Sequence, residues 1–301
     1  MSAQRVARHL GTLLILAMPM AALAGGDAAI TLGTGPSGFD SRAIDAGIDL
    51  GALPLHVNAG YFSASSGGET TLEQANAGLD WQVSESVAVN LGMSRIDDDI
   101  FIMDGTDIGI DIGLNTLWNS KKRTNLNLAV GRMEYGPDTD RGLPAALLNA
   151  LPVQNRYSIG LSQSLTESLT ANLGYDYYDY TEDPAALARS IDLAFLKRGR
   201  FPPNSAFTIA AFPDRTWSAG LDWEVGGNIG LDLSYSHTET VIGQKLKNTS
   251  LGFTHYGEVF TFGVSISRSS STEVKTERLD ITAFPSSSDT YVDFRIGMKF
   301  D

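Results

Sequence analysis

Aspartate follows glycine at a spacing of two residues in several places along this sequence of 301 residues. The pairs are Gly47 with Asp49, Gly78 with Asp80, Gly109 with Asp111, Gly174 with Asp176, Gly220 with Asp222, and Gly230 with Asp232. In a β-strand, residues i and i+2 lie on one face, so each pair places a missing side chain beside a carboxylate. The glycines relieve crowding and ease strand curvature, and the carboxylates make this face negative.

The residues next to these aspartates are apolar and recur with a period of two, which indicates strands with one apolar face and one polar face. Segments of this kind, each near ten residues long, begin at Ala28 and continue to the C-terminus. The expected strands are 28–34, 42–50, 53–63, 71–83, 87–95, 106–118, 125–134, 156–165, 169–180, 214–225, 228–237, 249–256, 259–269 and 291–301. We therefore predict an all-β protein of about 14 strands, with 12 as the alternative because the first segment is the weakest.

The last eleven residues carry the clearest strand pattern. Phe294, Ile296, Met298 and Phe300 alternate with charged residues or glycine, and Phe300 lies next to the C-terminal Asp301. In this strand the chain resembles the bacterial outer-membrane β-barrel superfamily, and in size and strand number it is most like the small monomeric porins. The resemblance implies a transmembrane antiparallel up-and-down β-barrel. It also implies that the barrel-assembly machinery recognises the C-terminal strand.

The lengths of the expected connections alternate, which fits short periplasmic turns and long outer loops. Short connections are expected near residues 51, 85, 121, 167, 226 and 257. Longer ones are expected at 63–70, 96–105, 135–155, 181–213, 239–247 and 270–290.

The N-terminus has the form of a secretory signal peptide. Arg5 and Arg8 precede an apolar run from Leu13 to Ala22, and Ala22-Leu23-Ala24 forms a cleavage site of the A-x-A type. We expect cleavage after residue 24, which leaves 25–301 as a single barrel domain. Cleavage also removes two positive charges from a chain whose formal net charge is −13. An acidic chain of this kind argues against nucleic acid as a partner.

The chain contains no cysteine, so its fold depends on neither a disulfide nor a thiolate metal site. Beyond the signal peptide no apolar run is long enough for a spanning helix, so the protein stays soluble in the periplasm or enters a membrane as strands. A composition of 43% apolar residues fits strands with one lipid face and one wet face.

Aromatic residues should form two belts at the membrane interfaces, because their amphipathic rings favour that depth. The expected periplasmic belt is Trp81, Trp118, Trp223, Phe260 and Phe300. The expected outer belt is Tyr61, Tyr157, Tyr175, Tyr177 and Tyr235.

Acidic residues dominate the expected inner wall, and a water-filled wall of this kind attracts cations. The lumen-lining acidic residues are Asp45, Asp49, Asp80, Asp107, Asp111, Asp176, Asp222 and Asp232, and the basic ones are Arg295 and Lys299. Asp222 and Asp232 should lie nearly opposite each other, where they could bind a cation or share a proton. The competing interpretation is that salt bridges to Arg95, Arg132, Arg295 or Lys299 neutralise many of these carboxylates.

Nothing in the sequence predicts catalysis, a cofactor or a metal site. Of the histidines in the expected mature chain, His237 and His255 fall on the apolar face, and His56 points inward with no serine or acid identifiable as its partner. The run Asp97–Asp99 is more typical of a solvated loop than of a calcium site.

Two outer segments, 142–151 and 184–196, are apolar and favour short helices. Phe201, Phe207, Ile209 and Phe212 follow the second of them. Apolar residues in such number need cover. They could form a lid, a constriction inside the barrel, or a site for a hydrophobic solute.

We therefore expect a monomeric outer-membrane channel for passive diffusion of small polar solutes or ions, with an acidic lumen partly occluded by the loops at 135–155 and 181–213. Its expected partners are outer-membrane lipid, the assembly machinery and the permeating solutes. Two alternatives stay open: a closed barrel with a structural or adhesive surface role, and a transporter for hydrophobic molecules. The fold alone does not decide among them.

Overall fold

The computed structural model describes residues 25–51, 53–98, 101–114, 122–137, 151–184, 212–275, 282–284 and 286–300. The expected signal peptide, 1–24, lies outside this part of the chain. Within the described ranges, no helix combines the length and the hydropathy needed to cross a membrane.

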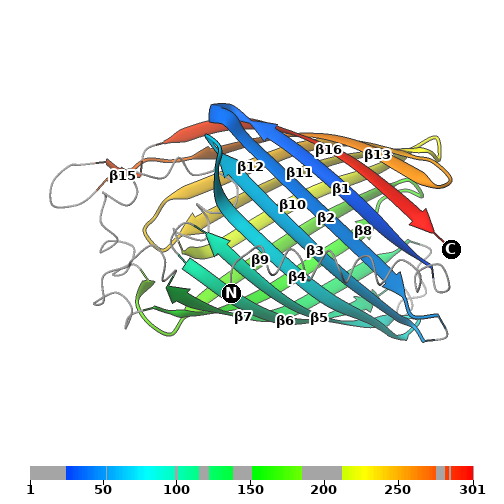
Figure 1. The fold of residues 1–301 in the computed structure, drawn as a ribbon. Helices are drawn as coiled ribbons and strands as arrows, with labels where there is room; N and C mark the ends of the chain where they lie inside the picture. The colour runs from blue at the N-terminus through cyan, green and yellow to red at the C-terminus, as the bar shows by residue number, and fades with distance from the viewer. Residues whose placement is uncertain are drawn as a thin grey trace.

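Fourteen antiparallel strands form a closed barrel (Figure 1), which confirms the predicted fold class. Each strand pairs with the next barrel strand in sequence, and β1 pairs with β16 to close the ring. The strands are β1 (Gly26–Gly35), β2 (Phe39–Asp49), β3 (Leu55–Ser66), β4 (Glu69–Ser84), β5 (Val87–Asp98), β6 (Phe101–Gly113), β7 (Thr124–Pro137), β8 (Val153–Ser164), β9 (Leu169–Tyr180), β10 (Pro213–Val225), β11 (Ile229–Thr240), β12 (Lys245–Tyr256), β13 (Phe260–Ser271) and β16 (Ser287–Phe300).

The first strand settles the strand number. β1 is paired along its length with β16 on one edge and with β2 on the other. The alternative of 12 strands is therefore wrong. The segment looked weak because its inward positions carry small residues, but its backbone completes the hydrogen-bond ladder that a barrel needs.

The connections at the two ends of the barrel differ in length, although less regularly than expected. We call the end with the connections 138–152, 181–212 and 272–286 the outer end, and the opposite end the inner end. The last of these connections contains a small two-stranded sheet, β14 (Val274–Lys275) with β15 (Thr282–Phe284), where only a loop was expected. It lies beyond the barrel wall in Figure 1.

Three other outer connections were predicted to be long, and they are short. β3 and β4 are joined only by Gly67 and Gly68, whose φ angles of 64° and 88° suit a tight hairpin turn. The connections predicted at 96–105 and 239–247 are also short, because β5 ends at Asp98 and β6 begins at Phe101, and β11 ends at Thr240 and β12 begins at Lys245. The 3-10 turn Pro36–Gly38 joins β1 to β2. The ladders continue beyond the apolar band, where outward residues are also polar, so the alternation that marks a strand disappears from the sequence.

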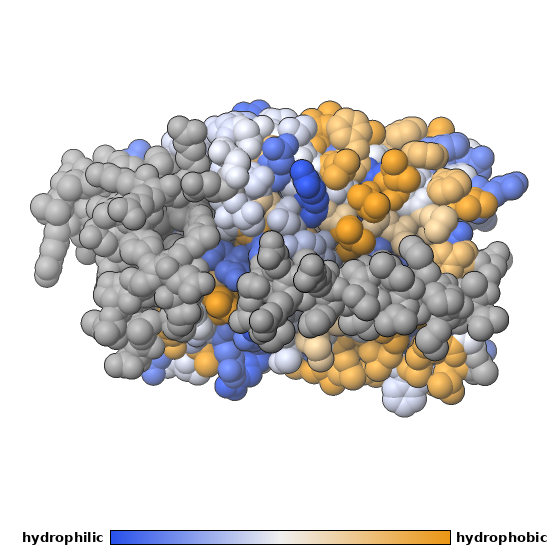
Figure 2. Space-filling model, in the orientation of Figure 1, coloured by the Kyte–Doolittle hydropathy of each residue, from blue (hydrophilic) through white to orange (hydrophobic). Residues whose placement is uncertain are grey.

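Large apolar side chains cover the outside of the barrel. Leu173, Met93, Leu251 and Ile296 are 60%, 62%, 57% and 55% exposed. On the face drawn in Figure 2, apolar side chains gather in a band nearer the end where β16 finishes, with polar side chains between that band and the outer end. A soluble protein would bury such residues, whereas a transmembrane barrel turns them toward lipid.

A second apolar group lies inside the barrel at the outer end. Inward-facing residues of β3 to β7 form a buried cluster with Phe212, the residue that precedes β10. The ring centroid of Phe212 lies 5.3 Å from that of Tyr135 and 6.0 Å from that of Phe101. The cluster consists of Ala64, Leu72, Ile96, Phe101, Met103, Tyr135 and Phe212, and we call it the mouth cluster.

Candidate functional site: the inner wall of the barrel

The inner wall carries the aspartates that the sequence analysis singled out. Each occupies the strand face opposite the exposed apolar residues: Asp45, for example, lies between the outward-facing Ile44 and Ala46. The same parity holds for the whole set, Asp45, Asp49, Asp80, Asp107, Asp111, Asp176, Asp222 and Asp232. Because the strands are antiparallel and in register, these carboxylates project toward the lumen from several strands.

Neutral donors, and not cations, hydrogen-bond several of these carboxylates. The two oxygens of Asp80 accept from Asn58 Nδ2 at 3.1 Å and Asn90 Nδ2 at 2.9 Å. Asn127 donates to Asp111 at 2.8 Å, Asn172 to Asp222 at 2.5 Å, and the hydroxyl of Ser158 to Asp176. An amide or hydroxyl donor orients a carboxylate and leaves its charge in place.

Other aspartates extend over a glycine on the neighbouring strand. Asp107 is the register partner of Gly92, and Asp232 is the register partner of Gly252. A Cβ atom added to either glycine would overlap the facing carboxylate. Asp45 has the same relation to Gly60. Gly60, Gly92 and Gly252 therefore make room for a carboxylate on the neighbouring strand, and they are not the glycines of the Gly-x-Asp pairs.

Asp222 and Asp232 are direct register partners on β10 and β11. Their surroundings differ, because Asp222 accepts the hydrogen bond from Asn172 and Asp232 lies against Gly252. In the described part of the chain, no three His, Cys, Asp or Glu residues group closely enough to hold a metal ion.

His56 has the acidic partner that the sequence analysis could not identify. Its Nδ1 atom lies 2.8 Å from Asp49 Oδ1, and the two residues are register partners on β2 and β3. They sit at the inner end of the barrel. The pairing depends on cross-strand register, which spacing along a single segment cannot supply.

A cavity of about 530 Å³ opens at the inner end and brings opposite charges together. Its lining includes the acidic Asp27 and Asp49 and the basic Arg295 and Lys299. Asp27 and Lys299 are register partners on β1 and β16. Among the described residues, neither of these cations forms an ion pair within 4.0 Å. The charges at this mouth are mixed, whereas the wall further along is mainly acidic.

Arg95 and Arg132 were expected as possible partners of the lumen carboxylates, and the structure contradicts this. Both lie on the outward face, near the outer end. Arg95 pairs with Asp104 at 3.3 Å and Arg132 with Glu134 at 3.0 Å. Their parity is that of the lipid-facing residues, so they cannot neutralise aspartates on the inner wall.

Arg156 is a basic residue of the inner wall that the sequence analysis missed. It is the register partner of Gly131 and of Tyr178, and it lines a cavity of about 200 Å³ with Asp107 and Gln154. Its position in the alternation of β8 was the available signal, because the outward-facing Tyr157 follows it directly.

The aromatic residues lie near both ends of the apolar band. Trp81, Trp223 and Phe260 are about half exposed near the inner end, and Phe300 has the same outward parity. Trp118 lies outside the described residues. Near the outer end are Tyr61, Tyr157, Tyr175, Tyr177 and Tyr235, together with Trp217, which the sequence analysis did not include and which packs on Tyr175 at 4.2 Å.

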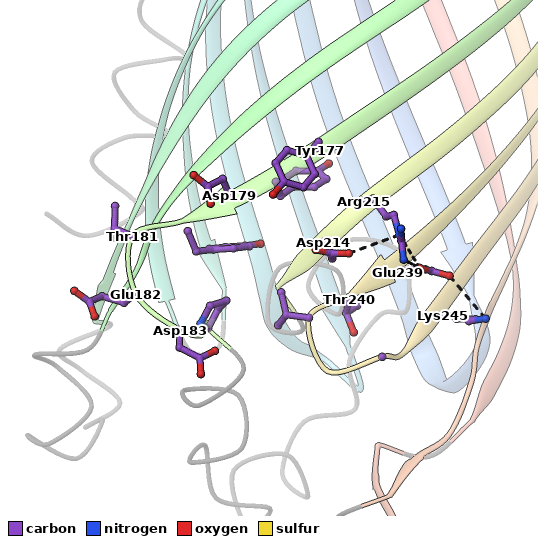
Figure 3. A pocket seen from close by; sticks show the side chains of 15 residues that line it. Tyr177, Asp179, Thr181, Glu182, Asp183, Asp214, Arg215, Glu239, Thr240 and Lys245 are labelled. Carbon is purple, nitrogen blue, oxygen red and sulfur yellow. Dashed lines mark hydrogen bonds and ion pairs between the residues drawn. The ribbon is translucent and has the colours of Figure 1, made fainter.

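The outer ends of β9 to β12 surround a further cavity of about 660 Å³ (Figure 3). Asp179, Glu182 and Asp183 line it on one side, and Asp214, Arg215, Glu239 and Lys245 on the other. Arg215, Glu239 and Lys245 have outward parity, so this charged cavity lies at the outer rim of the barrel. The mouth cluster is the apolar group inside the same end.

A closed ring of strands that turns apolar side chains outward and carboxylates inward has one structural interpretation. The fold is that of an outer-membrane β-barrel. No protein-family model matches the chain, and neither does any curated protein sequence.

Solved outer-membrane barrels share the architecture at low sequence identity. A KdgM porin is 6% identical, with a TM-score of 0.42 over 91% of this chain and 99% of its own. OccK3 (OpdO) of Pseudomonas aeruginosa is 10% identical, with a TM-score of 0.45 over 92% and 95%. The outer membrane channel DcaP of Acinetobacter baumannii is 8% identical, with a TM-score of 0.44 over 92% and 95%. TM-scores below 0.5 transfer neither a solute nor a pore size to this chain.

Proposed function

We propose that the protein is a channel of the bacterial outer membrane through which small polar solutes or ions diffuse, with a mild preference for cations. One observation supports this most directly: carboxylates on the inner wall are hydrogen-bonded by neutral amides and hydroxyls. Asp80, with two asparagine donors, is the clearest case. A wall lined by carboxylates that no cation neutralises raises the local concentration of cations.

The balance of charge on the inner wall supports the same proposal. Among the described residues, Asp27 and Asp293 join the eight aspartates on this wall, which carries three basic residues, Arg156, Arg295 and Lys299. Arg295 and Lys299 lie at the inner mouth. Arg95 and Arg132 are occupied on the outward face. A cation moving along the middle of the barrel would therefore meet mostly carboxylates.

We propose further that the outer end of the lumen is narrowed. The apolar side chains of the mouth cluster project from the inner wall into the outer end of the lumen. Phe212, the last residue of the 181–212 connection, packs in this cluster. The apolar segments 142–151 and 184–196, expected to occlude the lumen, lie almost wholly outside the described residues. The mouth cluster supports partial occlusion independently of them.

Export and assembly complete the proposal. Cleavage after Ala24 would release the mature chain into the periplasm, and the outward-facing Phe300 of β16 would serve the assembly machinery as its recognition signal. The barrel would then span the outer membrane as a monomer.

Planar bilayer recording tests the channel. The purified protein, shown to be folded by a mobility difference between boiled and unboiled samples, is added to a bilayer with a salt gradient of KCl. We expect steady openings and a reversal potential of the sign that indicates K⁺ over Cl⁻. Folded protein that gives no current, or a reversal potential that indicates Cl⁻ over K⁺, would contradict the proposal.

A further inference from the structure

The outward face of β11 to β13 carries cations at the border of the apolar band. Leu233, Leu251 and Ile266 are register partners on the three strands, and they are 46%, 57% and 50% exposed. Toward the outer end, the next outward-facing row contains Arg268, and the row after it contains His237 and Lys247. Positive charge therefore begins where the lipid-facing surface ends.

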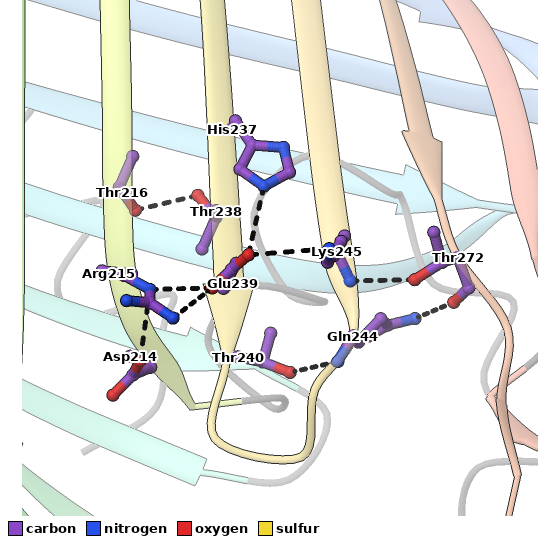
Figure 4. A network of polar contacts seen from close by, with 10 residues as sticks. All are labelled: Asp214, Arg215, Thr216, His237, Thr238, Glu239, Thr240, Gln244, Lys245 and Thr272. Carbon is purple, nitrogen blue, oxygen red and sulfur yellow. Dashed lines mark hydrogen bonds and ion pairs between the residues drawn. The ribbon is translucent and has the colours of Figure 1, made fainter.

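The carboxylate of Glu239, on this face, lies close to three basic side chains (Figure 4). Glu239 pairs with Arg215 at 2.6 Å, with Lys245 at 3.7 Å and with His237 at 3.7 Å. It is partly buried among them, with 26% of its side chain exposed. This network leaves Glu239 little capacity to neutralise a further cation.

Lys247 and Arg268 have no such carboxylate. In the described ranges neither forms an ion pair within 4.0 Å, and Arg268 Nε donates only to the hydroxyl of Ser288, at 3.2 Å. Lys247 is the register partner of Ser270, two residues from Arg268, so the two cations lie diagonally on adjacent strands. Diagonal neighbours of this kind are about 7–8 Å apart, within reach of long side chains. The outward-facing positions around Arg268 are uncharged: Tyr235, Thr249, Ser270, Ser288 and Thr290. Lys247 has Lys245 two residues along its own strand and His237 across the ladder. Its diagonal neighbour Glu239 is the carboxylate that already pairs with three basic groups.

The same level of the barrel on β5 to β7 is organised differently. There each guanidinium has its own carboxylate, Arg95 with Asp104 and Arg132 with Glu134. Of these two sectors, only the one at β12 and β13 carries an excess of positive charge. This difference between two sectors of one barrel provides an internal control.

We propose that Lys247 and Arg268 bind a phosphate group of an amphiphilic lipid in the outer leaflet, whose acyl chains lie along Leu251, Ile266 and their neighbours. Charge complementarity selects a phosphate, since paired Lys and Arg side chains bind phosphate oxygens strongly. The apolar rows directly below select a lipid over a soluble anion, because a membrane amphiphile places its charged headgroup at this border. The proposal rests on the proposed location in the outer membrane, and it is independent of conduction.

Native mass spectrometry of the full-length protein in neutral detergent tests this site. Lipid A carrying both phosphates is titrated against the wild type, against Lys247→Gln/Arg268→Gln, and against the control Arg95→Gln/Arg132→Gln. Both variants remove two positive charges from the outward face. We expect at least tenfold weaker binding to Lys247→Gln/Arg268→Gln and a change of less than threefold for the control. A mobility difference between boiled and unboiled samples shows that each variant is folded.

Two further probes decide the source of the phosphate. Dephosphorylated lipid A should bind the wild type and Lys247→Gln/Arg268→Gln alike, and inorganic phosphate should not compete at the concentrations that saturate with lipid A. Equal losses for the two double variants, no loss for either, or displacement by inorganic phosphate would overturn the proposal. Since binding is measured without current, a silent channel that still binds lipid A would contradict only the proposed function.

Discussion

At the scale of single residues, the inner wall depends on carboxylates that fit into spaces left by glycine. Asp232 occupies the space above Gly252, whereas a Cβ at Gly263, on the next strand, would make only ordinary contact with the Cβ of Arg295. The two glycines face the same lumen from β12 and β13. Their substitution by alanine should therefore differ in cost.

We predict that Gly252→Ala lowers the free energy of unfolding by about 1–3 kcal/mol, the range for overpacking a well-packed site. Gly263→Ala should change it by less than about 1 kcal/mol, because no neighbour must move. Urea unfolding in lipid vesicles measures both. Equal effects would show that the glycines serve strand curvature and not the facing carboxylate.

Phe212 gives a second prediction at this scale. It is fully buried in the mouth cluster, with a φ of 49° that is unusual for a residue other than glycine. Phe212→Ala should enlarge the outer opening and raise single-channel conductance. Phe253→Ala, on the outward face, removes the same atoms from the lipid side and should leave conductance unchanged. An unaltered conductance in Phe212→Ala would mean that the mouth cluster does not limit flow.

The positions of the inner-wall residues could be predicted from the sequence, but their partners could not. Alternation along a strand was enough to place the aspartates and glycines on one face. It could not supply partners, because cross-strand register decides that Asp49 meets His56 and that Asn90 meets Asp80. The same alternation places Arg95 and Arg132 on the outward face, so the expectation that they neutralise lumen carboxylates was wrong.

At the scale of strands, the two faces of β13 should respond oppositely to charge. Val264 faces outward between Phe253 and Phe294, and Ser265 faces inward beside Asp293, to which it donates a hydrogen bond at 3.4 Å. Val264→Arg should destabilise the folded barrel by about 2–4 kcal/mol, the cost of arginine on a lipid face near the midplane.

Ser265→Arg is the matched control one residue away. Its guanidinium would enter the lumen near Asp293, so the free energy of unfolding should change by less than about 1 kcal/mol. Equilibrium folding into phospholipid vesicles compares the two variants. If Ser265→Arg were the more costly, the assignment of faces on this strand would be reversed.

The apolar band also decides which parts of the strands could be predicted from the sequence. The apolar band marks the part of each strand inside the membrane, and there the predicted and observed strands agree; 169–180 was predicted with the bounds of β9. Beyond the band the outward residues are polar, and the inward residues of β3 to β7 include the apolar mouth cluster, so the alternation seen in the band is lost. β3 and β4 therefore extend to a two-residue turn where a loop was expected. Pairing of backbone groups continues there without any signal from side chains.

At the scale of the whole molecule, the barrel separates its charges by face. Carboxylates with neutral hydrogen-bond donors line the lumen. On the outward face, ion pairs lie near the outer end, and the apolar band lies between these ion pairs and the inner end. The chain has a formal net charge of −13, and part of its excess of acidic residues lies in the lumen. This separation is the physical basis of the proposed preference for cations.

The most direct test is the reversal potential under a KCl gradient for the wild type and for Asp80→Asn/Asp111→Asn/Asp222→Asn. These three carboxylates accept hydrogen bonds from asparagine donors on the inner wall. Asp104→Asn/Glu134→Gln, on the outward face, controls for the loss of acidic charge. We predict that the triple variant shifts the reversal potential toward zero and that the control retains the wild-type value. Equal potentials in all three proteins would contradict an acidic lumen as the origin of selectivity.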